Sequence, residues 1–236
     1  MKQEIIYGVR PVVEALKGGR RKVLEVLDAV GEGEVAGAAS ARGVEIKQTS
    51  RQRVEDLARG GLHQGVVARV EPYPYSSLEE ILAPPDPLVV VLDGVTDPRN
   101  LGAVLRAADA AGVSGVLVPK DRAAGVTAAA VKASAGASEH VRVARETNLR
   151  RAIGRMKDAG LWVYAADAGG APYTDLDLAG PVGLVFGSEG RGVRRLVREA
   201  CDGEVSIPML GAVGSLNVSV AAAVLLYEAR RQRGWP

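Results

Sequence analysis

Apolar runs alternate with amphipathic stretches along the chain, and the alternation is most regular after residue 87. Residues 88–92 are apolar throughout, which is typical of a strand covered on both faces. The pattern predicts an α/β fold in which six strands alternate with helices, with a mainly parallel sheet whose ligands bind at the carboxyl ends of the strands. The expected strands are residues 88–92, 115–118, 140–143, 161–165, 182–186 and 204–209, and the expected helices are residues 101–111, 127–133, 149–159, 193–200 and 218–231.

The pattern of the residues before position 71 predicts a smaller α/β domain. The next stretch, residues 71–87, contains five prolines among seventeen residues, and prolines at that density resist both helix interiors and central strands. The predicted division is a first domain at 1–71, a linker at 72–87 with a short helix at 77–82, and a second domain at 88–236. The first domain is expected to contain strands at 5–6, 23–27, 44–47 and 65–70 and helices near 12–16, 34–41 and 51–57.

The composition is that of an ordinary globular protein, with 47% apolar and 25% charged residues among 236. No apolar run reaches the roughly 18 residues that suggest a membrane-spanning helix, and the N-terminus lacks a signal-peptide pattern, so a soluble, cytoplasmic protein is expected. The single Cys201 excludes an internal disulfide. Two histidines, His63 and His140, give no metal-ligand cluster, so we expect metal-free chemistry.

The net charge of +2 is too small to indicate nucleic-acid binding by itself. An RNA-binding footprint would have to be a local patch. Residues 17–22, 191–198 and 230–233 are rich in arginine and lysine and are candidates for such a patch. Each of them could equally be a solvated basic face.

Three segments place polar residues directly after predicted strands. In the first, residues 92–106, Asn100 stands where a helix N-cap would. Arg106 follows about one and a half turns into the helix. Capping and simple surface exposure are the ordinary alternatives to a functional role for these two residues.

The second segment, residues 184–192, runs from a strand through FGSEGRG toward a helix. Its glycines follow the order G-x-x-G-x-G, which matches neither the dinucleotide fingerprint nor the P-loop. We expect these glycines to let a ligand approach the backbone closely. Glu189 is either a first-turn carboxylate favoured by the helix dipole or a polar contact to substrate.

The third segment, residues 207–220, follows the last predicted strand and carries Ser215 and Asn217 at the start of the final helix. Free backbone N–H groups at such a start can bind a ligand, and capping is the alternative role of both side chains. Taken together, the three segments bring Asn, Arg, Glu and Ser side chains to the ends of three strands in one sheet. That edge is where α/β proteins bind ligands.

In content, order and spacing, the three segments resemble the motifs of the SpoU (TrmH) family of RNA ribose 2′-O-methyltransferases, in the SPOUT superfamily. The matching stretches are residues 93–106 (DGVTDPRNLGAVLR), 186–192 (FGSEGRG) and 207–221 (IPMLGAVGSLNVSVA). Residues 6–16 and 63–70 also resemble the family's substrate-binding domain, which is similar to a ribosomal protein of the L30e type. The arrangement is most similar to the enzymes that methylate a guanosine ribose in 23S ribosomal RNA.

The resemblance implies a fold that the residue pattern does not give, because the family's C-terminal segment threads a loop to form a deep trefoil knot and knots are otherwise very rare. It implies S-adenosyl-L-methionine as cofactor, held in the knot largely by backbone, and a homodimer with the active site near the subunit interface. The cofactor positions implied here are Gly187, Ile207 and Leu216, with the neighbours Phe186, Met209 and Asn217 lining the pocket.

The resemblance also assigns catalytic roles. A ribose 2′-hydroxyl is a weak nucleophile near neutral pH, so methyl transfer requires alignment and stabilisation of the developing oxyanion. Arg106 is the expected key residue, acting as a cation rather than a base because its pKa lies above about 12. Asn100 and Glu189 are expected to position the ribose and Arg106, while Ser215 and Asn217 hold the loop or contact substrate.

Other functions remain open at this level. One is a ribose methyltransferase acting on transfer RNA or on a ribosomal site linked to antibiotic resistance, and another is a non-catalytic RNA-binding protein on the same scaffold. Arg99 departs from the family pattern, where histidine is common. The first domain also looks shorter than usual between residues 24 and 44, which affects the choice of RNA.

Overall fold

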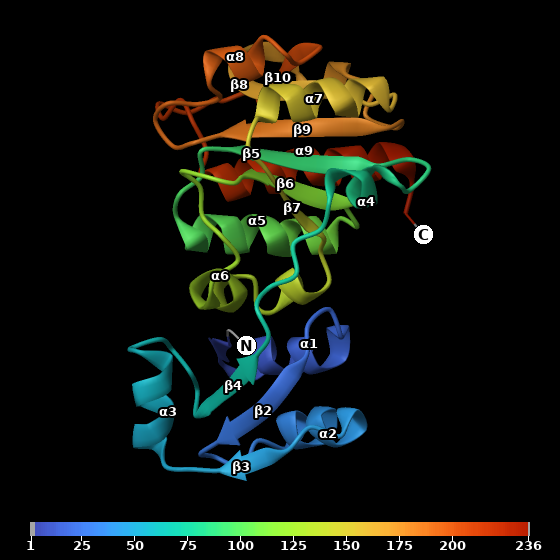
Figure 1. The fold of residues 1–236 in the computed structure, drawn as a ribbon. Helices are drawn as coiled ribbons and strands as arrows, with labels where there is room; N and C mark the ends of the chain where they lie inside the picture. The colour runs from blue at the N-terminus through green and yellow to red at the C-terminus, as the bar shows by residue number, and fades with distance from the viewer. Residues whose placement is uncertain (1–2, 236) are drawn as a thin grey trace.

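The computed structural model describes residues 3–235 and contains two β-sheets joined by one connecting segment (Figure 1). The N-terminal sheet has the strand order β1-β4-β2-β3, with β4 antiparallel to both neighbours and β2 parallel to β3. The sequence prediction of this α/β unit is confirmed element by element. Its elements are β1 (Glu4–Tyr7), α1 (Val9–Gly18), β2 (Val23–Asp28), α2 (Gly33–Arg42), β3 (Ile46–Gln48), α3 (Arg51–Ala58) and β4 (Val66–Val70).

The C-terminal sheet has six strands in the order β10-β8-β9-β5-β6-β7, and each neighbouring pair is parallel. The predicted parallel α/β sheet is therefore confirmed. Its elements are β5 (Leu88–Asp93), α5 (Pro98–Ala110), β6 (Gly115–Pro119), α6 (Ala128–Ala133), the 3₁₀ turn η1 (Ala137–Glu139), β7 (Val143–Glu146), α7 (Leu149–Asp158), β8 (Trp162–Pro172), the 3₁₀ turn η2 (Tyr173–Asp175), β9 (Val182–Gly187), α8 (Arg195–Arg198), β10 (Gly203–Ser206) and α9 (Val218–Arg233).

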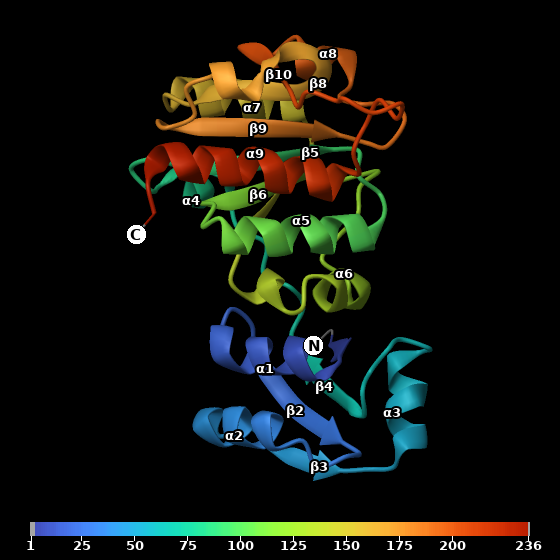
Figure 2. The ribbon, with the colours of Figure 1, turned by 180° about the vertical axis from the view of Figure 1, so that it is seen from behind.

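Helices cover both faces of this sheet, and the alternation of side chains along β5 explains why. Val90 points into the core shared with α5 and α9, whereas Val89 and Val91 point into the core shared with α7 and α4. All six residues of β5 are buried, as expected for a central strand with two covered faces. Helices α5 and α9 lie side by side on one face (Figure 2).

Several predicted boundaries are wrong. Strand β8 extends to Pro172 instead of ending at residue 165, because its end pairs with β10. The last strand ends at Ser206 instead of residue 209, because Pro208 cannot donate to the sheet and the following residues turn into solvent. Strand β7 begins at Val143, since His140 belongs to the turn after η1. The expected helix at 193–200 shrinks to α8 (Arg195–Arg198).

The proline-rich segment is packed along much of its length. The Tyr73 hydroxyl donates to the carbonyls of Ser138 and Val141 at 3.1 and 3.0 Å. Ser77 then caps the predicted short helix, α4 (Leu78–Leu82), with a capping box, and this helix buries Leu78 in the core under β5. The proline-rich segment is therefore packed against the fold although its composition is that of a linker. The domain boundaries at 71 and 88 stay a prediction.

The end of α9 is fastened by arginines. The Arg230 guanidinium donates to the carbonyl of Ala111 at 2.7 and 2.9 Å, and the Arg233 guanidinium donates to the carbonyls of Leu178 and Asp86 at 3.2 and 2.8 Å. The basic tail at 230–233 is therefore largely engaged in holding the fold, which corrects its interpretation as a candidate RNA patch.

The route from β10 to α9 spans several strands. Strand β10 lies at one edge of the sheet, whereas α9 packs against α5 and β9 in the middle, so residues 207–217 must cross the ends of β8 and β9. This path is compatible with the trefoil knot that the family resemblance implies. The knot itself stays a prediction.

Candidate functional site

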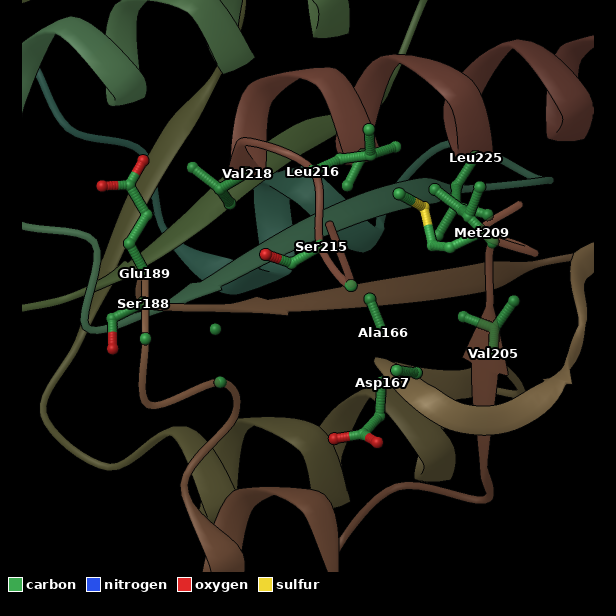
Figure 3. Close-up of a pocket in the computed structure, with 17 residues that line it drawn as sticks. Ala166, Asp167, Ser188, Glu189, Val205, Met209, Ser215, Leu216, Val218 and Leu225 are labelled. Atoms are coloured by element: carbon green, nitrogen blue, oxygen red, sulfur yellow. The ribbon is translucent and has the colours of Figure 1, made fainter. Parts of the chain in front are cut away.

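Residues 207–217, here called the crossing segment, close a cavity of about 370 Å³ at the carboxyl edge of the six-stranded sheet (Figure 3). Apolar side chains such as Val205, Met209 and Leu225 gather on one side, while Ser188 and Glu189 lie on the other (Figure 3). The lining residues are Ala166, Asp167, Ala168, Gly187, Ser188, Glu189, Gly190, Gly192, Val205, Ile207, Met209, Gly214, Ser215, Leu216, Val218, Ala221 and Leu225.

Glycines let one wall of the cavity be made of backbone. A Cβ atom on Gly187 would lie 1.9 Å from the carbonyl carbon of Gly192, far inside any real contact distance. The loop after β9 therefore folds directly back over Gly187, and the Gly192 N–H donates to the Ser188 carbonyl at 2.9 Å. A ligand in the cavity faces main-chain donors and acceptors at this wall.

An ion pair between a buried carboxylate and an exposed arginine anchors the far end of the same loop. The Asp93 carboxylate is fully buried and accepts from the Arg194 backbone N–H at 2.8 Å and from its guanidinium at 2.7 Å. The loop is thus held at both of its ends, at Gly187 and at Arg194. Sequence reasoning assigned no role to Asp93, although a carboxylate ending an otherwise apolar strand was a signal for one.

Three polar residues from the three predicted segments meet beside the cavity. The Glu189 Oε1 atom accepts from Asn100 Nδ2 at 2.8 Å and from Asn217 Nδ2 at 2.9 Å. Asn217 Nδ2 also lies 3.1 Å from Asn100 Oδ1. These residues, here called the polar triad, link the start of α5, the loop after β9 and the start of α9.

The structure excludes the ordinary roles of two triad residues. Asn100 is not the N-cap of α5, because Asp97 holds that position and accepts from the Arg99 N–H at 2.8 Å, with Pro98 in the first turn. Glu189 is not a first-turn carboxylate, since α8 begins only at Arg195. Both side chains are therefore free to serve the triad.

Asn217 has both of its possible roles at once. Its Oδ1 caps α9 by accepting from the Ser219 N–H at 2.9 Å, while its Nδ2 donates within the triad. Ser215 lines the cavity and projects from the crossing segment toward the side of Ser188 and Glu189 (Figure 3).

Arg106 stands apart from the triad. It is exposed on α5, six residues beyond Asn100, which is about 9 Å along the helix axis. It is absent from the cavity lining, and within residues 3–235 its guanidinium makes no hydrogen bond or ion pair. The structure thus brings four of the five expected catalytic residues to the cavity or the triad and leaves the fifth as an unengaged cation on α5.

Most of the expected cofactor positions line the cavity, namely Gly187, Ile207, Met209 and Leu216. Two do not: the Phe186 side chain is buried in the core with α5 and α9, and the Asn217 side chain turns to the triad. Sequence reasoning missed the middle of β8, where Ala166, Asp167 and Ala168 form a further wall. No local signal marks these residues, because their position follows from the strand order.

Two kinds of feature are absent from the part of the chain that the structure describes. Among residues 3–235, no helix is both long and apolar enough to cross a membrane. In the same range, no group of three or more His, Cys, Asp and Glu side chains is arranged to hold a metal ion.

Comparison with known proteins matches both parts of the chain. The model of the SpoU rRNA methylase family matches residues 87–227, and the model of the RNA 2′-O ribose methyltransferase substrate-binding domain matches residues 5–76. The protein is 43% identical to 23S rRNA (guanosine-2′-O-)-methyltransferase RlmB of Shewanella oneidensis over 98% of each chain. It is also 43% identical to RlmB of Escherichia coli, over 98% of this chain and 99% of that one.

A solved structure is similar over nearly the whole fold. The SpoU methyltransferase AviRb of Streptomyces viridochromogenes, in complex with the cofactor AdoMet, superposes with a TM-score of 0.82 at 30% identity and covers 98% of this chain and 90% of its own. Both sheets of this chain therefore have counterparts in one known structure. On the strength of its motifs, its site and these matches, the chain belongs to the SpoU rRNA methylase family.

Proposed function

We propose that this protein transfers the methyl group of S-adenosylmethionine to the 2′-hydroxyl of a guanosine ribose in 23S ribosomal RNA. The observation that carries the proposal is the polar triad beside the cavity, because it joins the three family motifs into one site. Near full-length similarity to RlmB supports the substrate. A ribosomal substrate also favours a cytoplasmic location.

The cavity suits the proposed cofactor. Its volume of about 370 Å³ falls in the usual range of small-molecule sites. The apolar side around Val205 and Leu225 suits an adenine ring, and the loop after β9 offers backbone hydrogen bonds. When bound, this cofactor supplies an electrophilic methyl group on a positively charged sulfur.

The residues of the chain would act on the ribose. Asn100 and Glu189 position the ribose beside the cavity, and Asn217 and Ser215 hold the crossing segment or contact the RNA. Arg106 holds an adjacent phosphate and lowers the pKa of the 2′-hydroxyl as a nearby cation. The hydroxyl proton leaves to phosphate or water, since a guanidinium is a poor base.

The direct test is transfer of labelled methyl from S-adenosylmethionine to deproteinised 23S RNA, followed by mapping of the 2′-O-methyl positions. We expect incorporation at one guanosine. Labelling of transfer RNA instead would favour the transfer-RNA alternative. RNA binding without any incorporation would favour the non-catalytic alternative and overturn the proposal.

Arg106→Ala tests the proposed mechanism. We expect it to retain S-adenosylmethionine binding and to lose most of its turnover. Arg99→Ala is the matched control, because Arg99 is an exposed arginine one heptad earlier on the same face of α5. Near-normal turnover of Arg106→Ala would remove this residue from the mechanism.

The family resemblance also leads us to propose a homodimer. Large apolar side chains are exposed on the crossing segment and on α9, beside the cavity: Leu210, Val213, Val220 and Tyr227. We propose that a second copy of the chain covers this apolar surface. Val220 and Tyr227 share one face of α9, and that face continues from the rim of the cavity. Sedimentation should give a dimer for the natural chain and a monomer for Tyr227→Glu.

A further inference from the structure

The basic stretch at residues 17–22 leads into the junction between the two sheets instead of forming a free surface patch. Arg21, just after α1, and Glu139, at the end of η1, have side chains only 1% and 0% exposed. Arg21 Nη2 lies 2.5 Å from Glu139 Oε1, and Arg21 Nε lies 3.2 Å from Oε2. This two-pronged ion pair joins residues 118 positions apart, and it corrects the interpretation of Arg21 as part of an RNA patch.

Other groups complete the shell of the ion pair. The carboxylate of Glu4, in β1, lies 3.2 Å from Arg21 Nη1. The ring of Tyr73 stands 5.6 Å from the guanidinium carbon, and burial raises the pKa of the Tyr73 hydroxyl, which keeps it a donor to Ser138 and Val141. The N-terminal sheet, the connecting segment and η1 therefore converge on one guanidinium.

The backbone is also tightly packed at this junction. A Cβ atom on Gly18 would lie 2.8 Å from the Glu139 carbonyl oxygen. More exposed contacts flank the pair: Lys132 Nζ to Gln64 Oε1 at 2.6 Å and His140 Nε2 to Glu14 Oε2 at 2.9 Å. Exposed contacts of this kind stabilise little. The buried pair therefore constrains the orientation of the two sheets more than these contacts do.

The pair reaches the functional site through packed elements. Both η1 and α6 pack against α5, the helix that carries Asn100 and Arg106. A buried ion pair contributes little net stability compared with apolar side chains of similar size, but its two parallel hydrogen bonds restrict geometry. Such a pair is therefore suited to fixing an orientation.

We propose that Arg21 and Glu139 are positioning residues that set the orientation of the N-terminal domain relative to the polar triad. RNA held by that domain then presents its target ribose at a fixed place on the catalytic edge. The inference rests on the proposed function for its RNA readout, although the orientation itself can be measured without any RNA.

The first experiment measures that orientation. Dyes are attached to cysteines introduced at Ser40 in α2 and Arg150 in α7, both exposed, with Cys201 replaced by alanine. Energy transfer should give one narrow distance distribution in the otherwise natural chain. It should broaden or shift when Arg21→Met and Glu139→Leu are combined, a pair of changes that leaves no unpaired buried charge from these two residues. An unchanged distribution in a folded double variant would overturn the proposal.

The second experiment separates positioning from folding. Methylation is measured on whole 23S RNA and on a short oligonucleotide that carries the mapped target and reaches only the catalytic edge. The double variant should lose about tenfold in kcat/KM on the whole RNA, mainly through KM, and keep its rate on the oligonucleotide. Lys22→Arg, which keeps the charge of this exposed neighbour, is the control and should change neither.

Each other outcome has a definite meaning. Equal losses on both RNAs would show that the pair only maintains the fold, and unchanged kinetics on both would show that orientation is set elsewhere; either result overturns the proposal. A natural protein that methylates neither RNA would contradict the proposed function instead, and the dye experiment would still decide the orientation.

Discussion

The polar triad and the Arg21–Glu139 pair are both small networks of carboxylates and nitrogen donors, yet they differ in what they leave unused. In the buried pair, both carboxylate oxygens of Glu139 are taken by Arg21. In the triad, Glu189 uses Oε1 twice, and its Oε2 has no partner within residues 3–235. The triad therefore leaves one carboxylate oxygen available to a ligand, whereas in the buried pair each oxygen already has a partner.

Because the two clusters differ in burial, mutations in them should differ in how much they lower the stability of the fold. A charge that is buried without its partner must be desolvated without compensation, and folding suffers. A charge at an open edge stays hydrated when its partner is removed, so folding suffers little. Removing one partner of the buried pair should therefore affect mainly stability, and removing a triad residue should affect mainly turnover.

Glu139→Ala should give the largest loss of stability. It leaves the buried Arg21 with only the partly exposed Glu4 as a partner, so the free energy of unfolding should fall by about 3 kcal/mol. Urea denaturation measures this loss. A decrease below about 1 kcal/mol, the range of an exposed pair, would erase the distinction between the two clusters.

Glu189→Ala should show the opposite behaviour. Turnover on 23S RNA should fall by roughly 100-fold, the scale of one lost polar group at a reacting centre, while the free energy of unfolding should change by less than about 1 kcal/mol. Paired kinetics and urea titration of one preparation check both values. A large stability loss with normal turnover would reverse the roles assigned here.

Asn217 allows the two effects to be separated in one residue. Asn217→Asp keeps an oxygen for the Ser219 N–H but loses the donor to Glu189, so stability should hold while turnover falls. Asn217→Ala loses the cap as well, which should cost about 1 kcal/mol of unfolding free energy. If the two variants have equal stability, the capping role is refuted.

Cys201 tests burial without a charged partner and should show the smallest effect. Burial raises the pKa of its thiol to about 12, so the protonated, unreactive form dominates at pH 7 to 9. Reaction with Ellman's reagent should be slow in the native protein at pH 8 and fast in urea, where the pKa returns to about 8.5. A fast native reaction would contradict this assignment.

The sequence predicted the parts of the molecule that depend on local patterns. Completely apolar stretches such as residues 88–92 identify central strands because both sheet faces are covered. The same reasoning extended the last strand over residues 207–209, where Pro208 and the turn into solvent end the ladder. Apolar character alone does not distinguish a strand from the wall of a cavity.

One site residue was misjudged for a local reason and two for long-range reasons. Whether Asn100 caps α5 depends on Asp97, three residues earlier, whose side chain takes the cap. The contribution of Asp167 follows from the place of β8 in the sheet, and the burial of Arg21 follows from a carboxylate 118 residues away. The sequence shows the charge of a side chain but not the direction in which the side chain points.

The arginine fastening at the end of α9 has a practical consequence for labelling this protein. Helix α9 ends at Arg233, at the side of the sheet opposite the loop after β9 (Figure 1), where Arg233 donates to the carbonyls of Leu178 and Asp86. An affinity tag or fluorescent protein appended beyond this helix would lie away from the proposed catalytic edge. Surface immobilisation through such a tag would leave that proposed edge accessible to RNA.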